Sequence, residues 1–346
     1  MIRFCDDYSE GCHEEILKML QETSRTQSDT YGLDSYTKRS EDRIRELFGS
    51  DSSAVHFLIG GTQANLILIS SVLRPYQAVL SADTGHIAVH ETGAIEGAGH
   101  KVILIPSCNG KIHPDQVLEA FHKHYSDPTA EHMPQPAMLY ISHPTEVGTL
   151  YSLEELKSLY QLCHEFHAVL YVDGARLGCA LTSPYTDITL EDLGRYTDAF
   201  TIGGTKMGAM FGEAMVINQP SLNHDFRYMI KHHGGLLAKG RLLGIQFDAL
   251  FRNNLYFELG KHANNMAFQL AKGIQSSGYS FRYPVQSNQI FPIFPASLLE
   301  SMRHQFVWSS DTPMQNGMIC IRLCTSWATP QENVDHFLSV VKNWKE

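Results

Sequence analysis

Seven short apolar runs alternate with helical patterns through the first two thirds of this 346-residue chain. Alternation of this kind is typical of a mainly parallel sheet with helices on both faces. We therefore expect an α/β large domain with a seven-stranded sheet, in which ligands bind beyond the carboxyl ends of the strands. The runs cover residues 55–59, 78–81, 102–105, 138–142, 169–172, 199–202 and 214–217.

The pattern changes near residue 242, where a long helical stretch through residues 246–270 is followed by shorter strand-like runs. These runs and a final helix predict a smaller α+β domain at residues 241–346. Residues 1–240 then form the large domain, with an N-terminal arm at about residues 1–20. The shorter runs lie at residues 281–283, 289–294 and 318–324.

Two capping signals predict where helices begin. Ser152-Leu153-Glu154-Glu155 has the pattern of a capping box and precedes an apolar-periodic segment at residues 153–165. Thr329-Pro330-Gln331-Glu332 has the same pattern before the final helix, with a proline in its first turn.

The chain is acidic, with a net charge of -10 at pH 7. This balance argues against nucleic acid or an anionic membrane as the main partner, although a pocket can still be locally positive. The N-terminus lacks the apolar core of a signal peptide, and no stretch approaches the roughly 18–20 apolar residues of a membrane span.

The seven cysteines are odd in number, scattered, and contain no Cys-x-x-Cys pair. We interpret them as reduced core residues, which predicts a cytoplasmic protein. Among the 18 histidines, the closest grouping is Cys163-His164 with His167, near the end of the predicted helix at 153–165. Nothing else completes a ligand set, so we interpret these as helix-surface histidines and expect no metal site.

The runs at 169–172 and 199–202 each lead into a reactive residue. Asp173 follows the first run, and Lys206 follows the second, within Gly203-Gly204-Thr205-Lys206-Met207-Gly208. An amine and a carboxylate at one sheet edge are the groups that hold pyridoxal phosphate. The amine forms a Schiff base with the cofactor's aldehyde, and the carboxylate keeps the ring nitrogen protonated. These positions predict an enzyme with Lys206 as its catalytic lysine.

Each of these residues has an ordinary alternative role. Asp173 could cap a loop, and Lys206 could be a solvated loop lysine. Arg176 could pair with Asp173, hydrogen-bond the cofactor's ring oxygen or lie on the surface.

A glycine-rich turn, Gly60-Gly61-Thr62, follows the run at 55–59 and precedes a helical run at 66–73. A helix start presents unpaired N–H groups to an anion, so Gly61 and Thr62 are candidate phosphate ligands. An ordinary strand-to-helix turn capped by Thr62 is the alternative. His86, after the run at 78–81, could stack on a cofactor ring and relay a proton, or form only local hydrogen bonds.

Taken in order along the chain, these pieces resemble the threonine aldolase / aromatic amino acid β-eliminating lyase family, which are pyridoxal-phosphate enzymes of fold type I. The resemblance covers essentially the full length, and its specificity lies in the joint occurrence of the motifs. The matching motifs are Tyr31-Gly32-x-Asp34, Gly60-Gly61-Thr62-Gln63-Ala64-Asn65, His86 with Glu91-Thr92-Gly93-Ala94, Pro144-Thr145-Glu146-x-Gly148-Thr149-x-Tyr151, Asp173-Gly174-Ala175-Arg176, Thr205-Lys206 and Ile321-Arg322-Leu323-x-Thr325.

The resemblance implies how the cofactor is held. His86 would stack on the pyridine ring, Asp173 would bind the ring nitrogen, and Arg176 would bind the ring hydroxyl. The phosphate would be held by Gly61, Thr62 and Thr205.

The resemblance also implies substrate-binding roles. Arg322 would clamp the substrate carboxylate, a role that suits its planar guanidinium, although an edge-strand surface pair is the alternative. Tyr31 would reach into the neighbouring subunit's site. Asp7 matches the acidic residue of an N-terminal Ser-Asp-Thr motif, which here is Asp6-Asp7-Tyr8.

Two further departures concern the substrate. Glu146 stands where some aldolases have a histidine that activates the β-hydroxyl, so the base could be Glu146, His86 or a bound water. Members of the family often have a second carboxylate-binding arginine in the glycine-rich segment that corresponds to the region near residue 237, where this chain has Leu237. Lys239 could substitute for it, or carboxylate recognition could rest on Arg322 alone.

The resemblance implies a retro-aldol cleavage of threonine or allo-threonine to glycine and an aldehyde. A β-eliminating lyase or a phenylserine-type aldolase is the alternative, and a pyridoxal-phosphate-binding protein without turnover is a third. Fold type I sites are shared between subunits, which implies a homodimer or homotetramer. The stereochemical preference at Cβ and the physiological substrate are left open.

Overall fold

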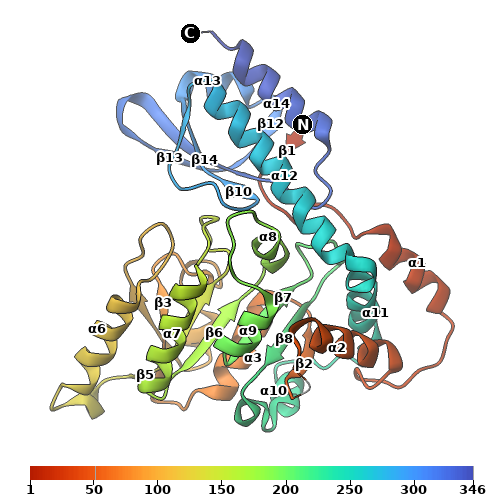
Figure 1. The fold of residues 1–346 in the computed structure, drawn as a ribbon, viewed down its shortest axis with the longest axis vertical. Helices are drawn as coiled ribbons and strands as arrows, with labels where there is room; N and C mark the ends of the chain where they lie inside the picture. The colour runs from red at the N-terminus through yellow and green to blue at the C-terminus, as the bar shows by residue number, and fades with distance from the viewer. Residues whose placement is uncertain (51, 346) are drawn as a thin grey trace.

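The computed structural model describes residues 1–50 and 52–345 (Figure 1). In that part of the chain a seven-stranded sheet has the order β2-β8-β7-β6-β5-β3-β4. Every strand overlaps one of the predicted runs, which confirms the predicted α/β sheet. The strands are β2 (Ala54–Leu58), β3 (Gln77–Ala82), β4 (Lys101–Ile105), β5 (Gln135–Ser142), β6 (Val169–Asp173), β7 (Ala199–Gly203) and β8 (Glu213–Ile217).

The strand directions bring the candidate site residues to one edge of this sheet. Among its seven described strands, β8 alone runs against the others, because it pairs antiparallel with both β2 and β7. The carboxyl ends of the parallel strands therefore lie at the same edge as Glu213, the first residue of β8. The turns that follow β2, β3, β5, β6 and β7 all open at this edge.

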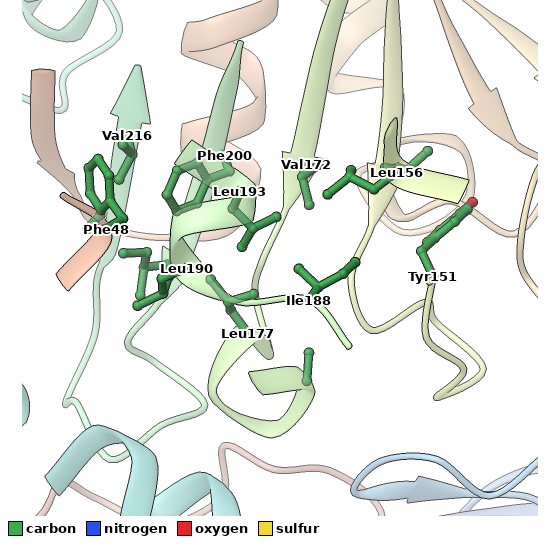
Figure 2. Close-up of a cluster of buried hydrophobic side chains, with 14 of the residues drawn as sticks. Phe48, Tyr151, Leu156, Val172, Leu177, Ile188, Leu190, Leu193, Phe200 and Val216 are labelled. Atoms are coloured by element: carbon green, nitrogen blue, oxygen red, sulfur yellow. The ribbon is translucent and has the colours of Figure 1, made fainter. Parts of the chain in front are cut away.

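Helices cover both faces of the sheet, as the alternation predicts. Successive residues of β6 point to opposite faces: Val172 packs with α7 and α9 on one face, whereas Tyr171 packs with α3 and α10 on the other. Figure 2 shows part of the first of these clusters, with Val172, Leu156 and Leu193 among the labelled side chains. The helices are α1 (Glu14–Thr23), α2 (Ser35–Phe48), α3 (Gly61–Val72), α4 (His86–Val89), α5 (Ala94–Gly97), α6 (Pro114–Tyr125), α7 (Leu153–Glu165), α8 (Leu177–Leu181), α9 (Leu190–Tyr196), α10 (Phe226–His232), α11 (Arg241–Leu250), α12 (Leu255–Ser276), α13 (Ala296–Met302) and α14 (Gln331–Asn343).

One capping prediction is confirmed and the other is wrong. The Ser152 side chain caps α7 and forms the predicted capping box with Glu155. The final helix, α14, instead has Pro330 in the N-cap position, with an extended ψ of 146°. The Thr329 hydroxyl accepts a hydrogen bond from the Ser326 N–H (2.7 Å), so it belongs to the preceding turn.

The long helix predicted through residues 246–270 is broken in the structure. It divides into α11 and α12, joined by the short 3-10 helix η3 (Arg252–Asn254). Asn253 and Asn254 have φ angles of 54° and 61°, in the left-handed region that asparagine tolerates better than most residues. The break therefore arises from local backbone geometry inside an otherwise continuous helical pattern.

A smaller sheet lies at the C-terminal end of the chain, as predicted. Its strands are β9 (Ser280–Phe281), β10 (Gln289–Ile290), β11 (Pro292–Pro295), β13 (Ser309–Pro313) and β14 (Met318–Cys324), and its central strand is β14. Helices α12, α13 and α14 pack against it around Phe294 and Phe337. In Figure 1, α12 runs from this region down toward the large sheet.

The N-terminus lies on this smaller region. Strand β1 (Ile2–Arg3) pairs in parallel with β12 (Phe306–Val307), and Phe4 packs in the same apolar cluster as Phe337. The first residues of the predicted arm therefore contact the C-terminal part of the chain (Figure 1). The division into residues 1–240 and 241–346 stays a prediction.

The cysteines only partly match the prediction that they are core residues. All seven are free, but Cys108 is exposed, and Cys5 and Cys12 are half-buried. The His164 ring hydrogen-bonds the Asp198 carboxylate (3.0 Å). In the described residues, no helix is both long and apolar enough to cross a membrane.

Gly174 follows Asp173 at the end of β6 and fixes its position against β7. A Cβ at this residue would overlap the carbonyl oxygen of Thr201. We expect Gly174→Ala to lower the free energy of unfolding by about 1–3 kcal/mol, because one strand end must shift. Gly97→Ala, at an exposed helix position with open space around it, should leave stability unchanged or raise it by up to about 1 kcal/mol. Urea denaturation measures both variants, and equal losses would contradict this explanation.

Candidate active site

The carboxyl ends of the parallel strands open onto a cavity of about 300 Å³. The structure brings together here all the predicted cofactor-binding and catalytic residues. The residues from that prediction that line the cavity are Gly61, Thr62, His86, Glu146, Asp173, Arg176, Thr205 and Lys206. Because they come from five different turns, their meeting follows from the sheet topology.

Lys206 is half-buried in the turn after β7, at the wall of the cavity. Burial lowers the pKa of its amine, and the nearby Arg176 guanidinium acts in the same direction. The carboxylates of Asp7, Glu213 and Asp173 oppose this shift but do not reverse it. A lowered pKa increases the fraction of neutral amine, which is the nucleophilic form.

Asp173 is held in a fixed position at the end of β6. Its Oδ2 accepts hydrogen bonds from the Tyr140 hydroxyl (2.7 Å) and the Asn65 amide (3.1 Å), and its Oδ1 accepts one from the Ala175 N–H (2.9 Å). Burial alone would raise the pKa of Asp173, but the hydrogen bonds from Tyr140 and Asn65 and the charge of Lys206 oppose it, and the net shift is downward. The side chain is therefore ionised at neutral pH and can hold a proton on a ring nitrogen.

A hydrogen-bonded chain orients His86, which begins α4. Its Nδ1 lies 2.8 Å from Oε1 of Glu91, and the same oxygen accepts a hydrogen bond from the Asn65 amide (2.7 Å). The Glu91 carboxylate favours a proton on Nδ1, which leaves a lone pair on Nε2. The matching motifs contain Asn65 and Glu91, but no role was predicted for either.

Glu146 links the loop after β5 to His86. Its Oε1 accepts hydrogen bonds from the His86 N–H (2.8 Å) and the Ser142 hydroxyl (2.5 Å). Burial raises the pKa of Glu146, and the Ser142 hydrogen bond opposes the shift without cancelling it. A carboxyl group with a pKa nearer neutrality is a better general base, which suits the predicted catalytic role.

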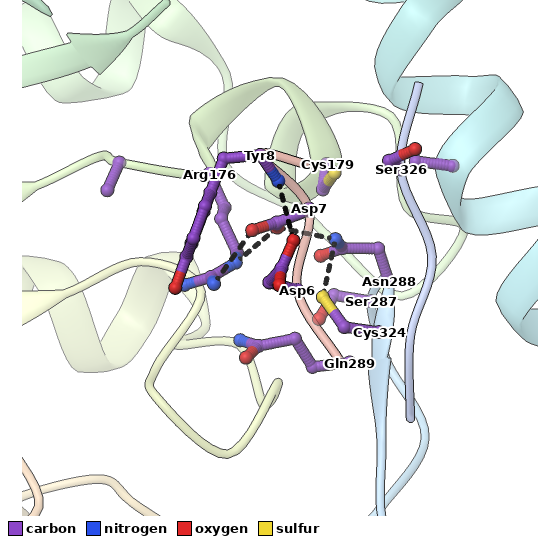
Figure 3. A network of polar contacts seen from close by, with 12 residues as sticks. Asp6, Asp7, Tyr8, Arg176, Cys179, Ser287, Asn288, Gln289, Cys324 and Ser326 are labelled. Atoms are coloured by element: carbon purple, nitrogen blue, oxygen red, sulfur yellow. Dashed lines mark hydrogen bonds and ion pairs between the residues drawn. The ribbon is translucent and has the colours of Figure 1, made fainter. Parts of the chain in front are cut away.

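Arg176 pairs with Asp7, which excludes the predicted alternative of a pair with Asp173. The guanidinium Nε and Nη2 donate to the two Asp7 carboxylate oxygens at 2.6 and 3.0 Å, and the Asn288 amide adds a third hydrogen bond at 2.9 Å. Figure 3 shows this network. Burial raises the pKa of Asp7, but the charges of Arg176 and Lys206 outweigh it and lower the pKa overall. The ion pair attaches the N-terminal segment to the cavity wall.

The other predicted substrate-binding residues lie outside the cavity lining. Arg322 is half-buried on β14, where its guanidinium donates to the Ser309 hydroxyl and the Cys5 carbonyl oxygen. Tyr31 and Lys239 line surface hollows elsewhere in the chain. Asp7 contacts the Arg176 guanidinium but does not itself line the cavity. The substrate-binding roles of these four residues stay predictions.

The cavity fits the chemistry of pyridoxal phosphate. Helix α3 begins at Gly61 without a side-chain cap, so its first N–H groups are available to a phosphate. The ionised Asp173 matches the ring nitrogen, the His86 imidazole can lie against the ring face, and Lys206 matches the aldehyde. The residues present therefore correspond to each functional part of the cofactor.

The Asp7–Arg176 pair gives a prediction for stability. Asp7→Asn removes the charge that compensates the buried Arg176 guanidinium, so it should lower the free energy of unfolding by about 3 kcal/mol. Asp6→Asn changes the neighbouring, partly exposed carboxylate, whose partners are Cys5, Tyr8 and Ser9. It should cost less than about 1 kcal/mol. Chemical denaturation compares the two variants. Similar losses in the free energy of unfolding would contradict a particular contribution of the Asp7–Arg176 pair to stability.

Comparisons with known proteins identify the family and the fold of the chain. The model of the beta-eliminating lyase family matches residues 5–296. A low specificity L-threonine aldolase from a Pseudomonas species is 30% identical over 96% of this chain and 94% of its own length. The solved structure of Leishmania major threonine aldolase has a TM-score of 0.96, is 44% identical, and covers 99% of both chains.

The fold extends to more distant proteins. A Thermus thermophilus aspartate aminotransferase structure, only 15% identical, has a TM-score of 0.72 over 99% of this chain and 91% of its own. That likeness concerns the fold alone and confirms fold type I. With its family match and its aldolase-like relatives, the chain belongs to the β-eliminating lyase family of pyridoxal-phosphate-dependent lyases.

Proposed function

We propose that this protein cleaves threonine or allo-threonine to glycine and acetaldehyde with pyridoxal phosphate as its cofactor. The observation that carries the proposal is the convergence of Lys206, Asp173 and His86 in one cavity. The relatives named as threonine aldolases, at 30% and 44% identity over nearly the whole chain, support the choice of substrate.

The chain's own residues have distinct tasks in this reaction. When bound, pyridoxal phosphate supplies an aldehyde carbon for covalent attachment and a protonated ring that withdraws electrons from the bond that breaks. Lys206 provides the neutral amine, Asp173 keeps the ring nitrogen protonated, and His86 fixes the plane of the ring. This plane decides which substrate bond breaks, because that bond must stand perpendicular to it.

Glu146 is the proposed base for the β-hydroxyl proton. It lines the cavity beside His86, and its raised pKa suits proton transfer near neutrality. Arg322 is the proposed clamp for the substrate carboxylate, from its position on β14 beside the N-terminal segment. Arg176 binds the cofactor's ring oxygen in this proposal, while its pairing with Asp7 holds the guanidinium in place.

We also propose a homodimer or homotetramer in which Tyr31 reaches the neighbouring subunit's site. Tyr31 lies outside the cavity of its own chain, which supports this arrangement. Lys239 is proposed to help bind the substrate carboxylate. A cytoplasmic location agrees with the seven free cysteines.

The reaction is tested by its products. Purified protein loaded with pyridoxal phosphate should convert L-threonine or L-allo-threonine to equal amounts of glycine and acetaldehyde, and phenylserine tests the related alternative. Lys206→Ala should lose the absorbance of the covalently bound cofactor and nearly all turnover, because no other amine lines the cavity wall in the described residues. Lys123→Ala, at an exposed position on α6, is the control. 2-Oxobutanoate and ammonia without glycine would discard the aldolase proposal, because these are the products of β-elimination from threonine.

Glu146→Gln tests the assignment of the base. We expect kcat for threonine to fall by about 100-fold or more, with the absorbance of the bound cofactor retained. Wild-type kcat/KM should fall as the pH drops through the raised pKa of Glu146, since only the ionised carboxylate accepts a proton, and this acid limb should disappear in the variant. Glu154→Gln, on the exposed side of α7, is the matched control. An unchanged kcat and pH profile would assign the base elsewhere.

A further inference from the structure

Glu213 lies on the cavity wall, and the sequence predicted no role for it. As the first residue of β8, it pairs with Leu58 of β2 on one side and with Gly203 of β7 on the other. Both neighbouring strands lead into turns that are predicted to hold the phosphate. Gly61 and Thr62 follow β2, and Thr205 follows β7. Glu213 therefore stands between the two halves of the predicted phosphate site.

The hydrogen bonds of Glu213 connect it directly to this site. The Thr205 hydroxyl accepts a hydrogen bond from the Gly212 N–H (3.0 Å) and donates a hydrogen bond to Oε1 of Glu213 (3.0 Å). The other carboxyl oxygen, Oε2, is buried and has no hydrogen-bond partner in the part of the chain that the structure describes. A buried polar atom without a partner costs about 1–3 kcal/mol, so a ligand that engages Oε2 gains this energy.

The surroundings of Glu213 favour its neutral form. Burial raises the pKa of its carboxyl group to about 8, although the Lys206 ammonium lowers it, and the charge of Asp173 adds to the rise. The titratable groups facing it are Lys206 and Asp173 beside the cavity, Tyr171 on β6 and Tyr256 on α12. A protonated carboxyl group donates a hydrogen bond, whereas an ionised one would repel a phosphate.

We propose that Glu213 binds the phosphate group of the cofactor as a neutral carboxylic acid, with Oε2 donating a hydrogen bond to a phosphate oxygen. At the same time, Oε1 of Glu213 accepts the hydrogen bond from the Thr205 hydroxyl. This inference rests on the proposed use of pyridoxal phosphate, and it adds a residue that senses pH to the phosphate site. Cofactor binding should therefore weaken when Glu213 loses its proton.

Binding to the apoenzyme measures this role without turnover. Pyridoxamine 5′-phosphate carries the phosphate but has no aldehyde to react with Lys206, and pyridoxamine lacks the phosphate as well. The dissociation constants of both ligands are measured by isothermal titration calorimetry on both sides of pH 8, for wild type, Glu213→Gln and Glu213→Leu. The glutamine amide retains a hydrogen-bond donor at every pH, and leucine offers none.

The three proteins should differ in a defined way. Above pH 8, wild-type affinity for pyridoxamine 5′-phosphate should fall by up to about tenfold per pH unit relative to Glu213→Gln, because the raised pKa means that the binding form is lost as pH rises. The comparison is made in a Lys206→Ala background, because the charge of Glu213 acts on the pKa of Lys206, and removing that amine lets the ratio isolate Glu213. Below pH 8, Glu213→Gln should bind this ligand nearly as wild type does. Glu213→Leu should bind it about tenfold more weakly and bind pyridoxamine unchanged.

Other results would overturn the proposal. A wild-type to Glu213→Gln ratio that stays constant across the pH range would remove the neutral-acid role, even if Glu213→Leu does not fold. Equal weakening of both ligands in Glu213→Leu would indicate a general structural role. Neither measurement involves threonine, so failure of this proposal is distinguishable from failure of the proposed aldolase activity.

Discussion

The hydrogen bonds that hold the Asp173 carboxylate are the interaction on which the rest of the site depends. Tyr140 reaches it from β5 and Asn65 from α3, while the Ala175 N–H closes the turn that follows β6. Through Asn65 the same network continues to Glu91 and then to His86. The group that faces a ring nitrogen and the group that faces the ring plane are therefore positioned by one set of contacts.

A second constraint connects the site to the smaller region of the fold. Asp7 follows the strand that pairs with β12, and it binds both Arg176 from the large sheet and Asn288, which precedes β10. A shift of the smaller sheet would move Asp7 and with it Arg176. This arrangement gives the N-terminal segment a direct effect on the cavity, although that segment lies far from Arg176 in the sequence.

The sequence predicted the parts of the fold that depend on local apolar patterns. The strands of the large sheet and the helix capped by Ser152 have clear periodicity and capping residues. The break between α11 and α12 was missed because Asn253 and Asn254 interrupt a helical pattern without a proline or glycine. The cap of α14 was misplaced because Thr329 makes its hydrogen bond within a turn that only the tertiary structure shows.

The sequence also indicated some of the residues of the candidate site and missed others. Residues at the carboxyl ends of parallel strands were found because topology alone brings them together. Glu213 was missed because it stands at the amino end of an antiparallel strand, where no such rule applies. Tyr140 was missed because it lies inside β5 and resembles an ordinary buried tyrosine, although its hydroxyl contacts Asp173.

The central claim is that the Lys206 amine attaches the cofactor in the cavity beside Asp173. Its most direct test is borohydride reduction of the protein loaded with pyridoxal phosphate, followed by peptide mass spectrometry. We expect the phosphopyridoxyl group on the peptide that contains Lys206. A label on another lysine, such as Lys239, or no stable label on any peptide, would contradict the account.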